Sequence, residues 1–298
     1  MDVVTKTSDG TRNTTRHPGG SPANVALGLG RLGIQTEFLT SLAPDEFGNT
    51  IAQHLRESGV SIAPESFNAE RTSSAVATIE TAGSASYDFN VVWQIADAPS
   101  LPPADIVHTG SIGAFLRPGA EQVRKFVASR SESLVSFDPN IRPSLVGRRS
   151  DAREQFERFA AISQLVKLSD EDADWLYPGH DLETVREHLF ALGVLLVAVT
   201  LGGKGSTLST PEDSVTIPPI SGVRGDTIGA GDSYMAALLA GILNPASGSE
   251  HPNRLAGLKR DDLLYLGNLA ASAAAITVSR NGADLPNLDD LRQFRLSV

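Results

Sequence analysis

The sequence predicts an α/β fold in which a parallel β-sheet is covered by helices on both faces. Short apolar runs bounded by turns alternate along the chain with segments of helical periodicity. These runs are apolar throughout, which is typical of strands buried on both faces of a sheet. Alternating β and α units of this kind form a parallel sheet, and ligands bind beyond the carboxyl ends of its strands.

The alternation can be followed element by element. Helices are expected at residues 23–32, 47–58, 119–129, 152–161 and 183–192. Buried strands are expected at residues 36–39, 106–109, 134–137, 165–168 and 194–200. Two further apolar segments, residues 233–241 and 264–278, are expected to be helices.

One segment departs from the alternation. Residues 73–80 and 84–92 read as two strands joined by a turn at 81–83, which predicts a β-hairpin. Such a hairpin would protrude from an α/β core. The alternative is an edge hairpin that extends the main sheet.

Length, composition and charge limit the possible functions. The 298 residues contain no linker-like or low-complexity tract, so we expect one large domain with a small appendage. The chain has no cysteine, which excludes disulfides, zinc thiolate sites and thiol catalysis and is typical of a reducing cytoplasm. A formal net charge of −10 argues against a nucleic-acid partner. Since no apolar run approaches membrane-spanning length, we expect no membrane partner and a cytoplasmic location.

The most informative motif is the glycine-rich turn at residues 226–232. Gly229, Ala230 and Gly231 directly precede an apolar helix, so their backbone N–H groups can converge on an anion beside the positive end of the helix dipole. Asp232, in the first helical turn, could accept a proton beside a bound phosphate. Transfer of a phosphoryl group to a hydroxyl needs this combination. The alternative is an ordinary helix start with an acidic residue.

A second glycine motif lies near the amino terminus. Gly19 and Gly20 permit a tight turn, Ser21 can cap the following helix, and Pro22 suits its first position. Gly33 closes the helix. Asn24 therefore lies in the first turn, where its amide can donate to and accept from sugar hydroxyls.

Together the two motifs resemble the two signatures of the ribokinase-like (PfkB-type) carbohydrate kinases. Further matches lie at residues 39–48, 107–111, 135–142, 166–169 and 199–205. In this combination, the amino-acid sequences of the motifs are most similar to those of the fructokinase branch. The resemblance implies an α/β/α sandwich with a small β lid and an ATP-dependent sugar kinase. Fructose is the leading substrate, and 2-keto-3-deoxygluconate, ribose and nucleosides are alternatives. A non-catalytic sugar- or nucleotide-binding protein is the alternative of another class.

The resemblance also assigns roles to residues. It makes Asp232 the catalytic base and Gly229, Ala230 and Gly231 the anion site. The substrate-binding residues would be Asp2, Gly19, Gly20, Asn24, Asn140 and Arg142. Of these, Asn140 would contact the sugar or the phosphate, and Arg142 would help to balance phosphate charge. The nucleotide-binding residues would be Lys167, Thr200, Gly202, Gly203, Gly205, Thr227, Asn268 and Ala271. The segment at 200–205 lacks the Gly-Lys-[Ser/Thr] of a P-loop, so it is not a Walker A motif.

Three other residues have both a structural and a functional interpretation. Asp226 is expected to set the geometry of the glycine-rich turn rather than to react. Asp138 is either a turn-capping carboxylate or a site residue, because Asp-Pro is common turn chemistry. His108, at the end of an apolar run, is expected to pack rather than to catalyse.

The expected metal site departs from the family pattern. Ser169 and Asp172 stand where the family has Asn-x-x-Glu, so we assign Asp172 to Mg²⁺, acting through water. Asp170 or Glu171 could serve instead, and an acidic first turn needs no metal to explain it. K⁺ is an optional second cation.

Residues 3–16 and 70–93 are expected to form the lid, and a homodimer through this lid is expected as well. Family members place a sugar-binding aspartate after their first strand, and the spacing from Asp2 to Gly19 fits this pattern. We therefore expect the numbered chain to begin after a first strand, with Asp2 in the sugar site. The alternative is that Asp2 is a terminal residue without a role.

Overall fold

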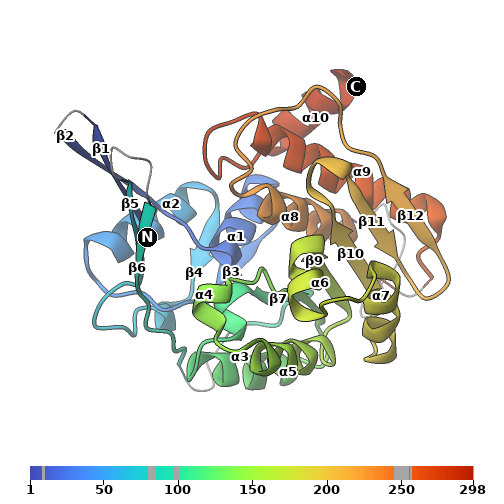
Figure 1. The fold of residues 1–298 in the computed structure, drawn as a ribbon, viewed down its shortest axis with the longest axis horizontal. Coiled ribbons are helices and arrows are strands. Elements are labelled where there is room, and N and C mark those ends of the chain that lie inside the picture. The colour runs from blue at the N-terminus through green and yellow to red at the C-terminus, as the bar shows by residue number, and fades with distance from the viewer. Residues whose placement is uncertain (9–10, 80–84, 97–100, 245–254, 256, 298) are drawn as a thin grey trace.

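The computed structural model describes residues 1–8, 11–79, 85–96, 101–244, 255 and 257–297. A central six-stranded sheet has the order β12-β11-β10-β9-β8-β7 (Figure 1). Its strands are β7 (Ile106–Gly110), β8 (Leu134–Asp138), β9 (Leu165–Ser169), β10 (Leu196–Thr200), β11 (Ser206–Ser209) and β12 (Ser214–Ile217). The strands β7 to β10 run parallel, as the sequence predicts, and β11 and β12 add an antiparallel hairpin at one edge.

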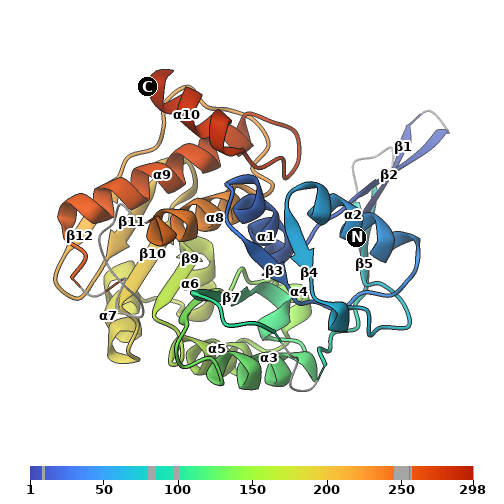
Figure 2. The same cartoon turned by 180° about the vertical axis from the view of Figure 1, so that it is seen from behind.

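Helices cover both faces of this sheet (Figures 1 and 2). One face packs against α1 (Ser21–Arg31), α8 (Ala230–Leu243) and α9 (Arg260–Val278). The other packs against α3 (Gly119–Ala128), α5 (Arg149–Ala160), α6 (Asp170–Leu176) and α7 (Leu182–Ala191). Neighbouring residues of one strand enter different cores, because successive side chains alternate across a sheet: Leu165 joins the first core and Val166 the second. This burial on both faces explains the continuous apolar runs.

The predicted hairpin belongs to a separate sheet. β5 (Ser74–Ile79) and β6 (Ala85–Asn90) join β1 (Asp2–Ser8) and β2 (Thr11–His17) in a four-stranded sheet of order β2-β1-β5-β6. This sheet projects from one side of the body (Figure 1). The alternative of an edge hairpin on the main sheet is therefore wrong. The predicted turn at 81–83 lies outside the described residues.

The strand expected at 36–39 does not join the main sheet either. β3 (Thr36–Phe38) pairs in parallel with β4 (Val60–Ile62), a strand that the sequence analysis did not assign, and the two form a sheet of their own. They are connected by α2 (Glu46–Glu57), whose N-cap Asp45 accepts a hydrogen bond from the Gly48 amide at 2.8 Å. The predicted parallel sheet is thus divided in two.

Several elements differ from prediction in extent. α5 begins at residue 149 and α9 at residue 260, each earlier than expected, because their first turns are polar and carry no apolar periodicity. The sequence analysis did not assign α4 (Pro143–Val146), α10 (Leu288–Ser297) or the short 3₁₀ turns η1 (Pro64–Ser66), η2 (Ser111–Ala114) and η3 (Gly202–Lys204).

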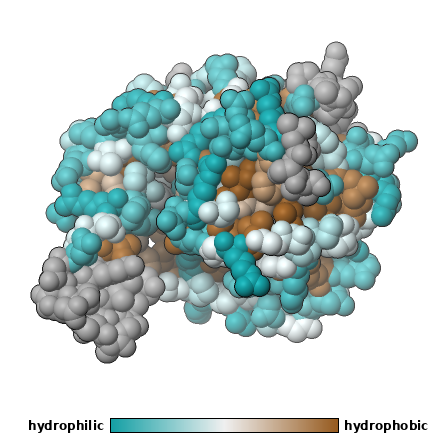
Figure 3. Space-filling model, turned by 90° about the horizontal axis from the view of Figure 1, so that it is seen from above, coloured by the Kyte–Doolittle hydropathy of each residue, from teal (hydrophilic) through white to brown (hydrophobic). Residues whose placement is uncertain are grey.

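The surface seen from above is mostly hydrophilic. The largest group of apolar residues lies in the middle and to the right of this face (Figure 3). Among the residues that the structure describes, no helix is both long enough and apolar enough to cross a membrane.

Candidate functional site

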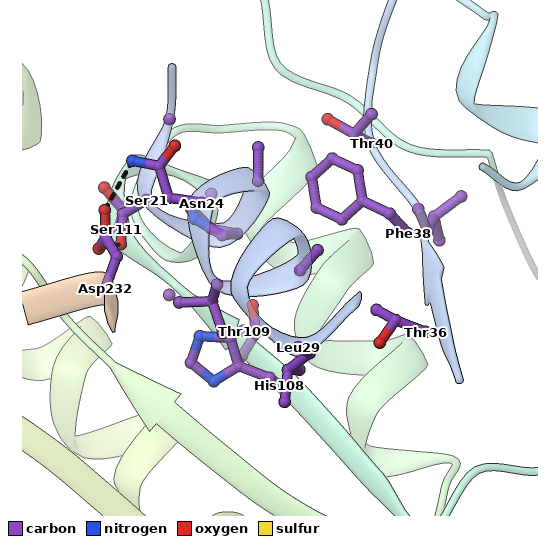
Figure 4. A pocket seen from close by; sticks show the side chains of 18 of the residues that line it. Ser21, Asn24, Leu29, Thr36, Phe38, Thr40, His108, Thr109, Ser111 and Asp232 are labelled. Atoms are coloured by element: carbon purple, nitrogen blue, oxygen red, sulfur yellow. Dashed lines mark hydrogen bonds between the residues drawn. The ribbon is translucent and has the colours of Figure 1, made fainter. Parts of the chain in front are cut away.

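Asp232 lies where α1 and α8 meet. Its Oδ1 accepts a hydrogen bond from Ser21 Oγ at 2.6 Å, and its Oδ2 accepts one from Asn24 Nδ2 at 2.7 Å (Figure 4). The two helices approach closely at Gly28, where an added Cβ would lie 2.7 Å from Ala236 Cβ. A glycine at this crossing therefore brings the first turn of α1 within reach of Asp232.

The environment of Asp232 suits a proton acceptor. The residue is 7% exposed, and burial raises the pKa of its carboxyl above the ordinary value. Hydrogen bonds from Ser21 and Asn24, and the charges of Lys167 and Arg142, oppose this rise. Because the carboxylate is desolvated, it binds a proton more strongly than an exposed aspartate would.

The turn before α8 is fixed by Asp226. Its Oδ1 accepts a hydrogen bond from the Ile228 amide, and its Oδ2 accepts one from the Gly282 amide, each at 3.0 Å. Gly229 is the N-cap of α8 and has a φ of 78°, in the left-handed region that favours glycine. A Cβ on Gly229 would also lie 2.7 Å from Ala283 Cβ. The expected geometric role of Asp226 is confirmed.

A buried ion pair lies behind this turn. Lys167, in the middle of β9, has its Nζ 2.7 Å from Oδ2 of Asp138, the last residue of β8, and the two side chains are 5% and 1% exposed. A Cβ on Gly231 would be 3.1 Å from Lys167 Nζ, so the ammonium lies close to the start of α8. Burial opposes the charged form of Lys167, but Asp138 and the other nearby carboxylates outweigh it and raise its pKa.

Asn140 and Arg142 follow β8 and are bonded to each other. Arg142 Nη1 donates to Asn140 Oδ1 at 2.6 Å, and Asn140 has a φ of 36°, which asparagine tolerates better than most residues. The carboxylate of Asp2 packs against Gly19, where any Cβ would overlap it. Burial raises the pKa of the Asp2 carboxyl, and the amino terminus, His17 and Arg142 partly offset this.

These residues surround one cavity of about 1440 Å³. Most of the predicted site residues line it: Asp2, Gly19, Gly20, Asn24, Asn140, Arg142, Lys167, Thr227, Gly229, Gly231 and Asp232. They come from the amino-terminal segment, from the middle of the chain and from the start of α8. Asn24 and Asn140, far apart in the sequence, both line this cavity. Hydroxyl-binding groups, a desolvated carboxylate and a glycine turn with a nearby cation thus face the same space.

Comparison with known proteins agrees with the family resemblance of the two glycine motifs and extends it over nearly the whole sequence. The family model for pfkB family carbohydrate kinases matches residues 2–290. The chain belongs to this family. It is 32% identical to a fructokinase of Rhizobium leguminosarum bv. trifolii over 298 residues, covering 97% of this chain and 85% of that protein.

Solved structures of pfkB family members and related kinases share the fold. The fructokinase of Vibrio cholerae, solved with fructose, ADP and a calcium ion, has a TM-score of 0.79 and 26% identity. The aminoimidazole riboside kinase of Salmonella enterica, solved with its riboside and an ATP analogue, has a TM-score of 0.78 and 25% identity. Each comparison covers 98% of this chain and 96% of the other.

The other nucleotide-binding candidates of this pfkB family chain lie outside the cavity. Thr200, Gly202, Gly203 and Gly205 lie at the end of β10 and in the turn that follows, and Asn268 and Ala271 lie on α9. Asn268 Nδ2 donates to the Leu264 carbonyl of its own helix at 2.7 Å. Ala230, in the glycine turn, does not line the cavity either. Their roles remain predictions.

Asp172 has a structural role that the sequence did not indicate. Its Oδ1 accepts from the Ile141 amide at 2.8 Å and its Oδ2 from the Ser169 amide at 3.1 Å, and the Asp172 amide donates to Ser169 Oγ at 3.0 Å. This capping box starts α6 and ties it to the connection after β8. Its role at the metal remains a prediction.

A magnesium site built only from protein side chains is not present in the described part of the chain. No three histidine, aspartate or glutamate side chains there lie close enough together to hold a metal ion. The residues fit a Mg²⁺ ion held mainly by phosphate oxygens and water, because this ion keeps several waters and takes few carboxylates. Asp138 Oδ1, buried and without a hydrogen-bond partner, is the acceptor that the site leaves unused.

Sequence reasoning missed the role of Ser21. It was expected to cap α1, but Gly20 is the N-cap and the Ser21 hydroxyl bonds Asp232 instead. Its position three residues before Asn24 was the available signal, since residues three apart share one helix face. His108 packs as expected, with Nδ1 3.0 Å from Ser136 Oγ, and burial lowers its pKa to about 3, so its imidazole is neutral.

Proposed function

We propose that the protein is an ATP-dependent sugar kinase that phosphorylates a primary hydroxyl of fructose and forms fructose 6-phosphate. The observation that carries this proposal is the buried Asp232 carboxylate beside a glycine turn at the start of α8, both facing a cavity lined by amide and carboxylate side chains. The fructokinase of R. leguminosarum bv. trifolii and the fructose complex of the V. cholerae enzyme support fructose as the substrate.

The proposed chemistry assigns Asp232 the role of general base. It accepts the proton of the sugar hydroxyl as that oxygen bonds to the γ-phosphorus, while the bond to the ADP oxygen breaks. The amides of Gly229, Ala230 and Gly231 hold the transferred phosphoryl group, and the Lys167 ammonium adds positive charge behind them. General base catalysis contributes about 10² to 10⁴ in rate, and preorganised charge a similar or larger share.

Asn24 has two roles in this proposal. Its Nδ2 orients the base through Asp232 Oδ2, and its Oδ1 remains available to a sugar hydroxyl. Asp2, Asn140 and Arg142 complete the sugar site, with Gly19 and Gly20 allowing the close approach of the chain. Each of these side chains presents a hydrogen-bonding group to the same cavity.

The nucleotide is assigned to the surface next to the glycine turn. Thr227 lies in that turn, and Thr200, Gly202, Gly203 and Gly205 form the turn after β10. Asn268 and Ala271 of α9 complete the proposed binding site for the base and ribose. Asp172 would hold Mg²⁺ through water, and the ion would supply positive charge that offsets the charge of the phosphates. K⁺ is the second cation of the proposal.

A second substrate class has a specific observation in its favour. The riboside kinase of S. enterica has almost the same structural similarity to this chain as the fructokinase of V. cholerae, with TM-scores of 0.78 and 0.79. Ribose and nucleosides are therefore the first alternatives to fructose, followed by 2-keto-3-deoxygluconate. A non-catalytic binding protein is disfavoured, because sugar binding alone does not require a desolvated base next to an anion site.

A substrate panel tests the proposal. Purified protein is incubated with saturating ATP, Mg²⁺ and K⁺ and with fructose, ribose, 2-keto-3-deoxygluconate or a nucleoside, and ADP release is measured. We expect fructose to give the highest kcat/KM. No turnover with any sugar would contradict the kinase proposal. Strong ribose or nucleoside activity without fructose activity would contradict only the substrate.

A further inference from the structure

The segment that connects α9 to α10 lies between two parts of the site. Residues 280–285 pass beside α1 and the start of α8 (Figures 1 and 2). An added Cβ on Gly28 of α1 would lie 2.7 Å from Leu285 Cδ2, and one on Gly229 would lie 2.7 Å from Ala283 Cβ. The segment therefore touches α1 on one side and the glycine turn on the other, and neither contact leaves room for a side chain on the glycine.

Arg31 binds this segment from the last turn of α1. Its Nη1 donates to Asp284 Oδ1 at 2.7 Å and to the Leu285 carbonyl. The Arg31 side chain is 25% exposed. A guanidinium that bonds a carboxylate and a backbone carbonyl together fixes geometry as well as balancing charge, because its donors are planar and rigid. The end of α1 is thus joined to the backbone of the segment.

A second arginine holds the same carboxylate. Arg280 Nη1 lies 3.6 Å from Asp284 Oδ2, and Arg280 Nη2 lies 3.0 Å from Asp290 Oδ2. The Asp290 carboxylate also accepts from the Asn287 amide at 2.9 Å, at the start of α10. Asp284 therefore joins a guanidinium from α1 to one that is anchored on α10.

The segment in turn holds the glycine turn. The Asp284 amide donates to the Gly282 carbonyl at 2.9 Å, and the Gly282 amide donates to Asp226 Oδ2 at 3.0 Å. Hydrogen bonds from the Ile228 and Gly282 amides lower the pKa of Asp226, so its carboxylate stays charged and keeps both donors. A displacement of Asp284 would therefore move the Gly282 amide and, with it, the turn that Asp226 fixes.

We propose that Arg31 is a positioning residue for phosphoryl transfer. From the end of α1 it holds residues 280–285, and through the Gly282 amide and Asp226 it sets the glycine turn at the start of α8. One helix then serves both parts of the site, because its first turn orients Asp232 and its last turn fixes the anion-binding backbone. The effect on phosphoryl transfer rests on the proposed kinase function, whereas the order of the turn can be measured without any substrate.

The energetics favour an effect on position over an effect on stability. The Asp284 side chain is 49% exposed, and ion pairs with such partners contribute little to folding. Leu285, 1% exposed, keeps the segment docked through its apolar contacts. Arg31 also lines a polar cavity of about 650 Å³, so water can replace a lost guanidinium.

The experiment compares two substitutions of Arg31 with a matched control. Arg31→Met removes the donors and keeps the apolar stem, and Arg31→Lys keeps a positive charge and N–H donors. Arg186→Met on α7 is the control, because the Arg186 side chain is 26% exposed and pairs with Glu183 of its own helix at 3.2 Å. The kcat, the KM for fructose and for ATP, the thermal midpoint and amide hydrogen exchange at residues 226–229 and 280–285 are measured.

We expect Arg31→Met to lower kcat at least tenfold and to leave the KM for fructose within about threefold, because the glycine turn and not the sugar-binding side chains is displaced. Exchange of the Ile228 and Gly282 amides should be at least tenfold faster, with a small change in thermal midpoint. Arg31→Lys should keep kcat within about threefold of the unmodified protein. Arg186→Met should match the unmodified protein in every measurement.

A double variant tests the route from Arg31 to the turn. If Arg31 acts through Asp226, then Arg31→Met has little left to disturb once Asp226→Ala has removed the acceptor. The kcat/KM of the double variant should lie within about twofold of that of Asp226→Ala alone. Effects that multiply in the double variant would overturn the proposal, because they would show an action independent of Asp226.

Other outcomes separate this proposal from the kinase function. Normal kcat in Arg31→Met, or a lowered kcat with unchanged exchange at Ile228 and Gly282, would overturn the positioning role. No turnover in the unmodified protein would contradict the kinase function alone, since exchange still reports on the link. If Arg31→Met does not fold, Asp284→Ala breaks the same link from the exposed side, and normal kcat and exchange in that variant would overturn the proposal.

Discussion

At the scale of single residues, Asp232 is held by two donors from another helix. Ser21 and Asn24 each bond one carboxylate oxygen, so the Asp232 side chain cannot rotate freely and its hydrogen-bonding capacity is partly used. This arrangement fixes the direction from which a hydroxyl can approach. Substitution of Asp232 tests whether its carboxylate accepts a proton, whereas substitution of Ser21 tests how a neighbouring donor affects that carboxylate.

We expect Asp232→Asn to lower kcat by about a hundredfold or more, because it removes the proton acceptor and keeps the shape of the side chain. The thermal midpoint should change little, since an amide can still accept from Ser21. The measurement is kcat with saturating fructose and ATP. Asp289→Asn, the same chemical change on the exposed face of α10, is the control. Turnover near that of the unmodified protein would show that another group is the base.

We expect Ser21→Ala to move the acid limb of the kcat–pH profile to higher pH. The hydrogen bond from Ser21 lowers the pKa of Asp232, so its loss raises that pKa further. Asp232 must be deprotonated to act as a base, and activity is lost as pH falls through its pKa. Ser21→Thr keeps the hydroxyl and should restore the profile. An acid limb unchanged in Ser21→Ala would contradict the assignment of this limb to Asp232.

Gly231→Ala tests whether the glycine turn touches the phosphoryl group. The backbone of Gly231 is helical, so alanine is compatible with its conformation, but the new methyl lies 3.1 Å from Lys167 Nζ, at the proposed anion site. We expect kcat to fall at least tenfold with a small change in thermal midpoint. Steady-state kinetics with varied ATP provide the measurement, and normal kinetics would remove the phosphoryl group from this turn.

At the scale of elements, the start of α8 depends on a loop far away in the sequence. Asp226 bonds the Ile228 amide within its own turn and the Gly282 amide 56 residues later. The turn that we propose as the anion site is therefore positioned by the connection that leads into α10. Sequence reasoning identified the local half of this arrangement, because Asp-x-x-Gly turns have a recognisable local chemistry, but not the distant half.

We expect Asp226→Ala to lower kcat/KM by at least tenfold, because small displacements of a positioning loop impair catalysis strongly. Its effect on the thermal midpoint should be modest, since the side chain is only half-buried. The matched control is Asp213→Ala. The described hydrogen bonds of its turn join the backbone of Asp213 to the backbone and hydroxyl of Thr210, so the substitution leaves these groups in place. Equal kinetics in the two variants would contradict the positioning role.

At the scale of the whole molecule, the projecting sheet is the surface on which we propose that two copies associate. Phe89 of β6 is 37% exposed, and Val92, two residues after the end of this strand, is 57% exposed. We expect the protein to sediment as a dimer and Val92→Lys to shift it toward monomer. Leu195→Lys, at a residue 38% exposed on the main body, is the control and should leave the dimer intact. A monomeric unmodified protein would contradict the proposal.

The sequence by itself determined the features that depend on short-range patterns. Continuous apolar runs identified the parallel strands β7 to β10, because burial on both faces removes polar residues from each strand. The two glycine motifs identified Asn24, Asp232 and the turn between Asp226 and Gly231, because tight turns and helix starts restrict nearby residues directly.

Only the tertiary structure decided the contacts between distant segments. Ser21 meets Asp232 across 211 residues, Lys167 pairs with Asp138 in the interior, and both oxygens of Asp172 bind backbone amides. The division of the sheet between β3 and β7 was likewise not predicted, since a strand's apolar pattern records its burial and not its hydrogen-bonded neighbour. Local sequence restricts local conformation, whereas the partner of a side chain or a strand edge is chosen by packing of the whole chain.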